Sequence, residues 1–151
     1  MPKQSFKKRT GGALLLCGLI CCLAACDKQT PISLQQTPPV VIQPTLSSIQ
    51  ANIFALKCAV AGCHVTGGIA PMSLESGNAF AGLVNASSNY GTPRLLRVKA
   101  NDAANSALYL KIIGDAQTGG AQARMPLGIG PMSSAEVSAI QMWINNGAVD
   151  N

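Results

Sequence analysis

Two segments of the chain have apolar side chains at helical spacing, residues 47–57 and residues 133–146. The apolar positions with this period are Leu46, Ile49, Ile53 and Leu56 in the first segment and Val137, Ile140 and Ile144 in the second. Each segment also begins with the two side chains of a capping box, Ser47 with Gln50 and Ser133 with Glu136. We therefore predict that one helix opens the folded domain and another closes it.

The segments between these helices have weaker patterns. Residues 74–84 have a faint helical period, and the apolar run at residues 95–98 predicts extended structure. Ser106 is a favourable N-cap for a helix that would end at Gly114. Residues 115–131 are rich in glycine and predict a long loop. No strand alternation is sustained, so the sequence predicts a small, loop-rich, all-α domain.

The N-terminal residues have the composition of an export signal. Basic residues within positions 1–9 precede an apolar stretch at positions 13–25 that is shorter than the roughly 20 residues of a membrane span. The run from Leu23 to Cys26 resembles the lipobox of bacterial lipoproteins. That resemblance implies removal of residues 1–25, acylation of Cys26 and an exported protein held on a membrane, on the periplasmic side. An uncleaved anchor or a secretory signal without lipid is the alternative.

Residues 26–46 contain four prolines among polar residues, which predicts an extended tether between the lipidated cysteine and a domain at residues 47–149. Four of the eleven basic residues lie in the signal, and all six acidic residues lie after it. The processed chain therefore has a net charge of about plus one, which excludes a basic footprint for nucleic acid. Aromatic residues are 4% of the chain, so the core is thin unless a cofactor fills it.

The motif with the most specific chemistry is Cys58-Ala-Val-Ala-Gly-Cys63-His64. Two thiols with a histidine directly after the second can attach a haem and bind its iron, although the usual gap between the cysteines is two residues. Residues five apart on a helix are rotated by about 140°, so the two thiols would point apart unless the segment leaves the helix. Gly62 gives the backbone the freedom for such a loop.

Two other interpretations of the motif remain open. An exported protein can form a disulfide between Cys58 and Cys63, with His64 facing solvent. A structural zinc site usually has four ligands, and these residues supply three.

His64 is the only histidine, so the second axial ligand of a bound haem would be methionine or lysine, or the position would be open. Met142 lies within the last helix and is predicted to fill the core. Met132 has the position of a hydrophobic staple, and Met72 is close to His64 in sequence. Met125 remains, in the glycine-rich loop, and we predict it as the iron ligand.

These features resemble cytochrome c domains over residues 47–149. The matching features are the first helix, the cysteine–histidine motif, Met125–Pro126 in a glycine-rich loop, and the run from Trp143 to Ala148 that ends the last helix. Residues 97–110 resemble the middle of the larger bacterial members. The resemblance implies a few helices around one haem c. Its first and last helices would pack across each other at Ile49, Ile53, Phe54 and Trp143.

The resemblance to cytochrome c domains implies electron transfer with redox partner proteins. The residues add no catalytic constellation, since no paired acids converge and the single histidine is assigned to the iron. The protein is therefore predicted to be a carrier and not an enzyme. The alternatives are a haem sensor, an accessory subunit of an oxidoreductase, and a lipoprotein with a disulfide and no haem. Four basic side chains are candidates to pair with haem propionates: Arg94, Arg97, Lys99 and Arg124.

Overall fold

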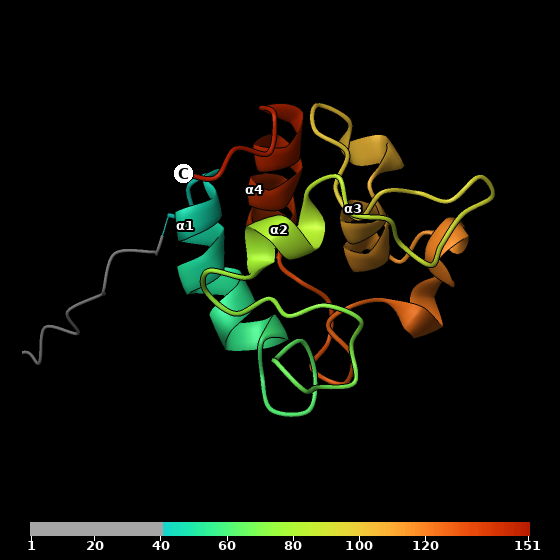
Figure 1. The fold of residues 1–151 in the computed structure, drawn as a ribbon, viewed down its shortest axis with the longest axis horizontal. Helices are drawn as coiled ribbons and strands as arrows, with labels where there is room; N and C mark the ends of the chain where they lie inside the picture. Colours follow the sequence, from blue (N-terminus) through green and yellow to red (C-terminus); the bar gives the residue numbers. More distant parts are fainter. Residues whose placement is uncertain (1–40) are drawn as a thin grey trace, which may run out of the picture. The chain divides into compact units, whose positions relative to one another are not determined.

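The computed structural model describes residues 41–151 (Figure 1). The predicted signal, the predicted lipidation site Cys26 and most of the predicted tether lie outside these residues. Within them, helices alternate with turns, and the extended pairings are three isolated β-bridges. None of the described helices has the length and apolar character that a membrane span requires. The all-α class is confirmed for the part of the chain that the structure describes.

The first helix begins as α1 (Leu46–Ile49) and continues without a break as the π-helix η1 (Gln50–Cys58). Its N-cap is Thr45, whose Oγ1 accepts a hydrogen bond from the Ser48 backbone N–H at 3.3 Å. The predicted capping box that begins at Ser47 is therefore wrong. Thr45 supplies the acceptor that the first turn requires, and it lies two residues earlier.

The folded domain also begins before the predicted boundary at Ser47. Leu46 is buried, and Ile42 packs against the core although it was assigned to the tether. The end of the predicted tether is therefore part of the domain.

The π-helical segment changes which side chains of the first helix face the core. Its last turn closes with a hydrogen bond from the Ala59 N–H to the Phe54 carbonyl, five residues back, at 2.7 Å. Such wide turns do not preserve the 3.6-residue period, and Leu56, which that period places on the buried face, is 66% exposed. Gln50, the other half of the rejected capping box, donates its side-chain amide to the Leu74 carbonyl at 2.9 Å.

The last helix, α4 (Ser134–Asn145), has the predicted start and end. Ser133 Oγ accepts the Glu136 N–H at 3.3 Å, and Glu136 Oε2 accepts the Ser133 N–H at 2.8 Å. This reciprocal pair confirms the second capping box. Gly147 follows the helix with a φ of +98°, a conformation that glycine adopts without strain.

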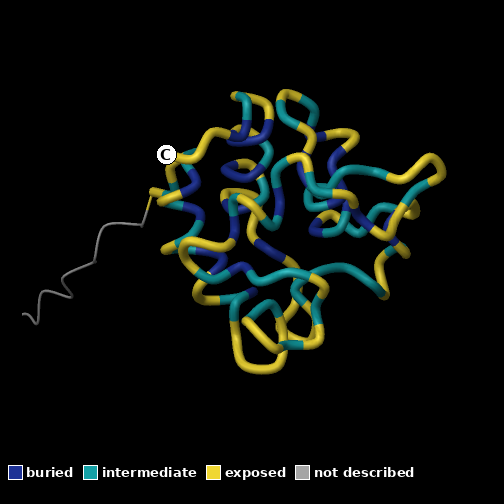
Figure 2. The backbone as a smooth tube through the Cα atoms, viewed as in Figure 1, coloured by how far each residue is buried: buried dark blue, intermediate teal, exposed yellow. Residues whose placement is uncertain are grey.

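The core lies where the first helix packs on α4 (Figures 1 and 2). Ile49, Ile53, Phe54 and Trp143 have no exposed surface and belong to one cluster, as the expected crossing requires. Met142 is 48% exposed, so its predicted role in the core is wrong. The buried side chains of α4 are at the spacing of one helix face, and Met142 falls outside that face. They are those of Glu136, Ala139, Ile140, Trp143 and Ile144.

The middle of the domain consists of short elements. They are α2 (Ala79–Leu83), the 3₁₀ turn η2 (Ala103–Asn105), α3 (Ala107–Ile113), and the 3₁₀ turns η3 (Ala116–Thr118) and η4 (Ala121–Ala123). The helix predicted over residues 74–84 is shorter than expected. The Glu75 carboxylate accepts hydrogen bonds from the Thr66 N–H and the Ser73 hydroxyl, both at 2.8 Å, and these keep the residues before α2 in a loop.

The extended structure predicted for residues 95–98 is confirmed. Val98 forms a parallel bridge with Val84, and Leu96 forms one with Ser106. These bridges hold the segment between α2 and α3, where the Val98 side chain is fully buried.

Helix α3 begins after Ser106 and ends at Gly114, whose φ is +77°, as predicted. The Ser106 side chain does not cap it, because its Oγ accepts the Lys99 N–H at 2.9 Å and donates to the Asp102 carbonyl at 2.7 Å. The only helical elements in the predicted loop over residues 115–131 are the 3₁₀ turns η3 and η4.

Candidate functional site

The cysteine–histidine motif begins at the last residue of η1 and leaves the helix at once, as predicted. The His64 N–H donates back to the Cys58 carbonyl at 3.2 Å, and the Cys63 N–H donates to the Val60 carbonyl at 2.9 Å. Gly62 has a φ of +79° within this loop. The four residues between the cysteines therefore form a closed turn that returns His64 to the end of the first helix.

The residues after His64 fix this turn from the other side. The Leu74 N–H donates to the His64 carbonyl at 2.8 Å, so both sides of the His64 backbone are held. Gly68 lies so close to the Cys63 carbonyl that a Cβ atom would clash with it. This segment of backbone has room only for glycine at that position.

The two cysteines of the motif are free thiols in different environments: Cys58 is buried and Cys63 is exposed. Burial raises the pKa of Cys58 to about 11, the negative charge of Glu136 adds to this rise, and Lys57 opposes it. The Cys58 thiol is therefore protonated at neutral pH. The structure has no disulfide between the two residues.

The His64 imidazole is neutral at neutral pH. Burial lowers its pKa, the nearby backbone of Met72 opposes that change, and the charge of Arg97 adds to it. A neutral imidazole is the form that binds a metal ion. Its Nδ1 is the one buried side-chain polar atom in residues 41–151 that has no hydrogen-bond partner. An unpartnered buried atom of this kind is expected where a bound ligand, or a small rotation of the ring, would give the atom the partner that it lacks.

His64, Cys58 and Met125 line one cavity of about 70 Å³, although Met125 is far from the other two in the sequence. The other lining residues are Met72, Leu74, Leu83, Arg97, Ala107, Leu108, Lys111, Ile112 and Met132. Cys63 is not among them. The structure thus brings together three of the four residues predicted to hold the cofactor.

Three methionines line this cavity, which the sequence did not indicate. Met132 is 8% exposed and Met125 is half-buried. Met72 borders the same space, next to His64. The staple position of Met132 is consistent with its burial before α4, but that role does not remove it from the cavity. The choice of Met125 as the ligand stays a prediction.

Of the four basic residues predicted to pair with propionates, Arg97 alone lines the cavity. Its Nη1 donates to the Gly82 carbonyl at 2.9 Å, which leaves other guanidinium donors for a carboxylate. Lys99 forms an ion pair with Asp102 at 2.7 Å instead, and Arg94 is exposed. Arg124 is half-buried but does not line the cavity.

Lys111 lines the cavity and was missed by the sequence interpretation. Its Nζ donates to the Tyr90 hydroxyl at 2.9 Å and to the Thr118 carbonyl at 2.8 Å. The helical period of this segment could have identified Lys111. Four lining residues form one face of α3: Ala107, Leu108, Lys111 and Ile112.

The side chains that line this cavity are chemically suited to bind a haem, but the present volume of the cavity is too small for one. A neutral imidazole and a thioether are iron ligands, a cysteine thiol is the group that forms a thioether link, and Arg97 is a partner for a carboxylate. The space is smaller than the roughly 300 Å³ or more of a typical ligand pocket, so a porphyrin would displace side chains that now fill it. Methionine moves easily, and three methionines are among those side chains.

The described part of the chain has no cluster of side chains of the kind that a zinc site requires. Residues 41–151 contain no group of three or more His, Cys, Asp or Glu side chains that could hold a metal ion. The zinc interpretation therefore still lacks ligands.

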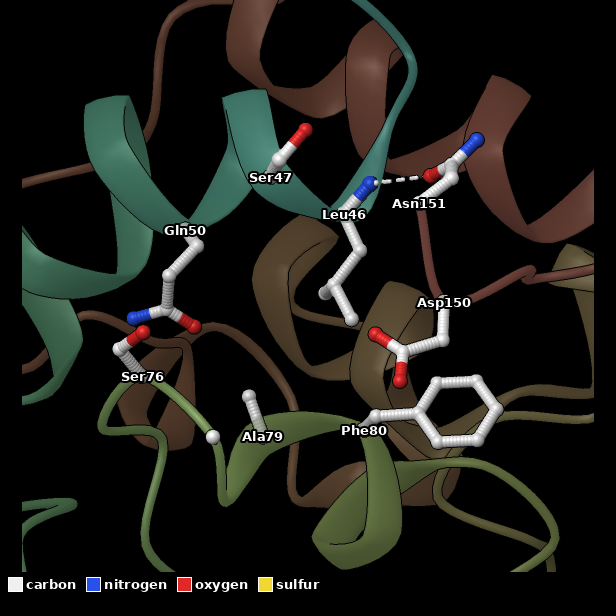
Figure 3. A pocket seen from close by; sticks show the side chains of 9 residues that line it. Leu46, Ser47, Gln50, Ser76, Ala79, Phe80, Asp150 and Asn151 are labelled. Atoms are coloured by element: carbon white, nitrogen blue, oxygen red, sulfur yellow. Dashed lines mark hydrogen bonds between the residues drawn. The ribbon is translucent and has the colours of Figure 1, made fainter.

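A second hollow lies between α1, α2 and the end of the chain (Figure 3). Asn151 closes it, because its Oδ1 accepts the Leu46 N–H at 2.9 Å and its carbonyl accepts the Ser47 N–H at 2.8 Å. These are the free N–H groups of the first turn of α1. The hollow contains no cysteine, histidine or methionine, and its polar contacts have a structural role.

Comparison of the chain with protein-family models, with curated proteins and with solved structures finds no match.

Proposed function

We propose that this protein is a monohaem cytochrome c, exported and held on a membrane by a lipid on Cys26, which carries single electrons between redox partner proteins. One observation supports this most directly. Cys58, His64 and Met125 line the same cavity, although Met125 is 61 positions from His64 in the chain. The sequence motif by itself does not require Met125 to line the same cavity as Cys58 and His64.

In this proposal Cys58 and Cys63 hold the haem as thioethers. Each thiol adds across a vinyl group: a sulfur–carbon bond forms, the thiol hydrogen goes to the other vinyl carbon, and no external oxidant or reductant is needed. Cys58 lies at the buried end of the attachment segment and Cys63 at its exposed end. The two links would therefore fix the cofactor between the core and the surface.

The bound haem would supply one-electron chemistry, and the residues of the chain would set its conditions. His64, neutral and half-buried, and Met125 would be the residues that bind the iron. A thioether ligand raises the reduction potential relative to a second nitrogen donor. Arg97 would neutralise a propionate at the cavity wall. Cys58 and His64 are assigned to the haem, and no other residue that lines the cavity is a cysteine, histidine or carboxylate, so we propose a carrier and not an enzyme.

The first test is covalent attachment. Made together with a cytochrome maturation system, the protein should keep peroxidase-active haem through denaturing electrophoresis, because thioether bonds survive denaturation. The double variant Cys58→Ala/Cys63→Ala should lose all of it. Cys26→Ala removes the one other cysteine of the chain that is proposed to remain after processing; it lies outside the domain, so this control should keep the haem. A colourless wild-type protein under these conditions would contradict the proposal and leave the disulfide interpretation.

The second test concerns the axial methionine. Met125→Ala should abolish the sulfur-to-iron charge-transfer band of the oxidised protein and lower its reduction potential, because a thioether stabilises the reduced state. Met142→Ala alters an exposed methionine outside the cavity and should leave both unchanged. If Met72→Ala or Met132→Ala removes the band and Met125→Ala does not, the ligand has been assigned to the wrong methionine.

A further inference from the structure

The loop with Met125 is hydrogen-bonded at two points to Lys111 of α3. The Met125 N–H donates to the Lys111 backbone carbonyl at 3.1 Å. This bond fixes the backbone at the residue whose side chain is the proposed iron ligand, and the acceptor is on the face of α3 that lines the cavity.

The Lys111 side chain holds the other end of the same segment. Its Nζ donates to the carbonyl of Thr118 at 2.8 Å. Thr118 is 1% exposed and ends η3, seven residues before Met125. The backbone and the side chain of one residue thus bond to both ends of residues 118–125.

Tyr90 completes this arrangement from a third segment. Its hydroxyl accepts a hydrogen bond from Lys111 Nζ at 2.9 Å, and its ring centroid lies 4.3 Å from the same nitrogen. A cation over an aromatic face is attracted by the ring. The ammonium is therefore held by the loop before residue 95 and by the loop after α3 at once.

The other backbone hydrogen bonds of this segment join near neighbours in the sequence, such as those from the Gly120 N–H to the Asp115 carbonyl at 3.0 Å and from the Ala123 N–H to the Gly120 carbonyl at 3.1 Å. Gly119 and Gly120 both have positive φ, and the 3₁₀ turn η4 is its only regular structure. Beyond Met125, Leu127 and Ile129 are 59% and 63% exposed. Segments with few buried contacts open at low free energy, so their position depends on individual bonds.

We propose that Lys111, with Tyr90 and Thr118 as its partners, is a positioning residue that keeps Met125 on the iron. This inference rests on the proposed haem function and adds to it. Lys111 does not bind the iron. It acts through the loop and resists the opening that would leave the second axial position free.

The test measures how readily an added ligand replaces Met125 in the oxidised, haem-loaded protein. Imidazole is titrated while the sulfur-to-iron charge-transfer band is followed. Lys111→Leu keeps an aliphatic side chain and removes the ammonium without adding a thioether to the cavity, and the loss of hydrogen bonds from a partly exposed charged donor should raise the apparent imidazole affinity by roughly tenfold. Tyr90→Phe leaves the charge of Lys111 in place and should raise the apparent imidazole affinity by a smaller factor.

Two matched controls are present in the chain. Lys99→Leu removes a lysine whose ion pair with Asp102 lies outside the cavity, and Tyr109→Phe removes the hydroxyl of the only other tyrosine. Both should bind imidazole as the wild-type protein does. Hydrogen exchange at the amide of Met125, measured without added ligand, should be faster in Lys111→Leu and unchanged in the controls.

Equal imidazole affinity in the wild type, Lys111→Leu and Tyr90→Phe would overturn the inference, provided that Met125→Ala raises this affinity. If Lys111→Leu does not fold with haem, Tyr90→Phe decides by the same comparison. A wild-type protein that attaches haem but has no charge-transfer band, with Met125→Ala binding imidazole no better, would overturn both the axial assignment and this inference. A protein that attaches no haem fails the earlier electrophoresis test instead.

Discussion

Replacing Trp143 with alanine should lower the free energy of unfolding by about 3–5 kcal/mol, the usual effect of removing a buried tryptophan. Trp143 has no exposed surface and lies in the cluster where α4 meets the first helix. The chain has one tryptophan and three phenylalanines, so no other aromatic group can replace its volume. Small domains are stable by about 5–15 kcal/mol, and the variant should therefore be close to unfolding at ambient temperature.

Trp143 also has a polar contact that alanine would remove. Its Nε1–H donates to the Val149 carbonyl at 2.9 Å, which folds the end of the chain back over α4. Trp143→Phe keeps an aromatic ring and loses this bond, so it should have an intermediate effect. Met142→Ala is the matched control, one residue away on the exposed face, and should change the free energy by less than about 1 kcal/mol. Urea denaturation followed by circular dichroism measures all three, and equal midpoints for Trp143→Ala and Met142→Ala would contradict the assignment of the core.

Replacing Glu136 with alanine should lower the free energy of unfolding by roughly 2–4 kcal/mol, because one carboxylate has two structural roles. Its Oε1 pairs with Lys57 Nζ at 2.6 Å, directly before the attachment cysteine. Its Oε2 accepts hydrogen bonds from the N–H and the hydroxyl of Ser133 at 2.8 and 3.0 Å. The Glu136 side chain is 8% exposed, whereas that of Lys57 is 34% exposed, so solvent screens part of the pair.

A comparison of single variants separates the two roles. Lys57→Met removes the ion pair and keeps the cap, and should cost about 1–2 kcal/mol, less than Glu136→Ala. Lys99→Met is the control for a surface pair and should cost less than about 1 kcal/mol. If Lys57→Met and Lys99→Met have the same small effect, the pair beside Cys58 does not stabilise the domain.

The contribution of Glu136 should depend on pH in a defined direction. Burial alone would raise its pKa, but hydrogen bonds from Lys57 and Ser133, together with the Lys57 charge, lower it below the ordinary value of 4.5. The ionised carboxylate therefore stabilises the fold above that value, and the stabilisation is lost as the pH falls through the lower pKa of the folded protein. The difference between the wild type and Glu136→Ala should shrink over the same acidic range.

Local signals in the sequence were reliable where neighbouring residues decide the structure. Ser133 and Glu136 are three positions apart, and their capping box forms as predicted because it needs no other part of the fold. Ser47 and Gln50 have the same spacing, yet Thr45 caps that helix and Gln50 bonds to Leu74. A distant partner for Gln50 outweighed the local pattern.

The predicted face of the first helix failed for a related reason. A helical wheel assumes 3.6 residues per turn, and the switch to π-helical turns at Gln50 shifts the side chains that follow. Leu56 is consequently exposed, while Phe54 is fully buried. No short-range signal in the sequence identified this change of period.

By itself, the sequence determined the all-α class of the described domain, its two bounding helices and the cysteine–histidine motif, because periodicity, caps and adjacent reactive groups are local properties. Only the tertiary structure decided which side chains meet His64. It placed Met125 and Arg97 at the cavity, excluded Arg94, Lys99 and Arg124 from it, and added Lys111. Those contacts join segments tens of residues apart, and their packing depends on the whole core at once.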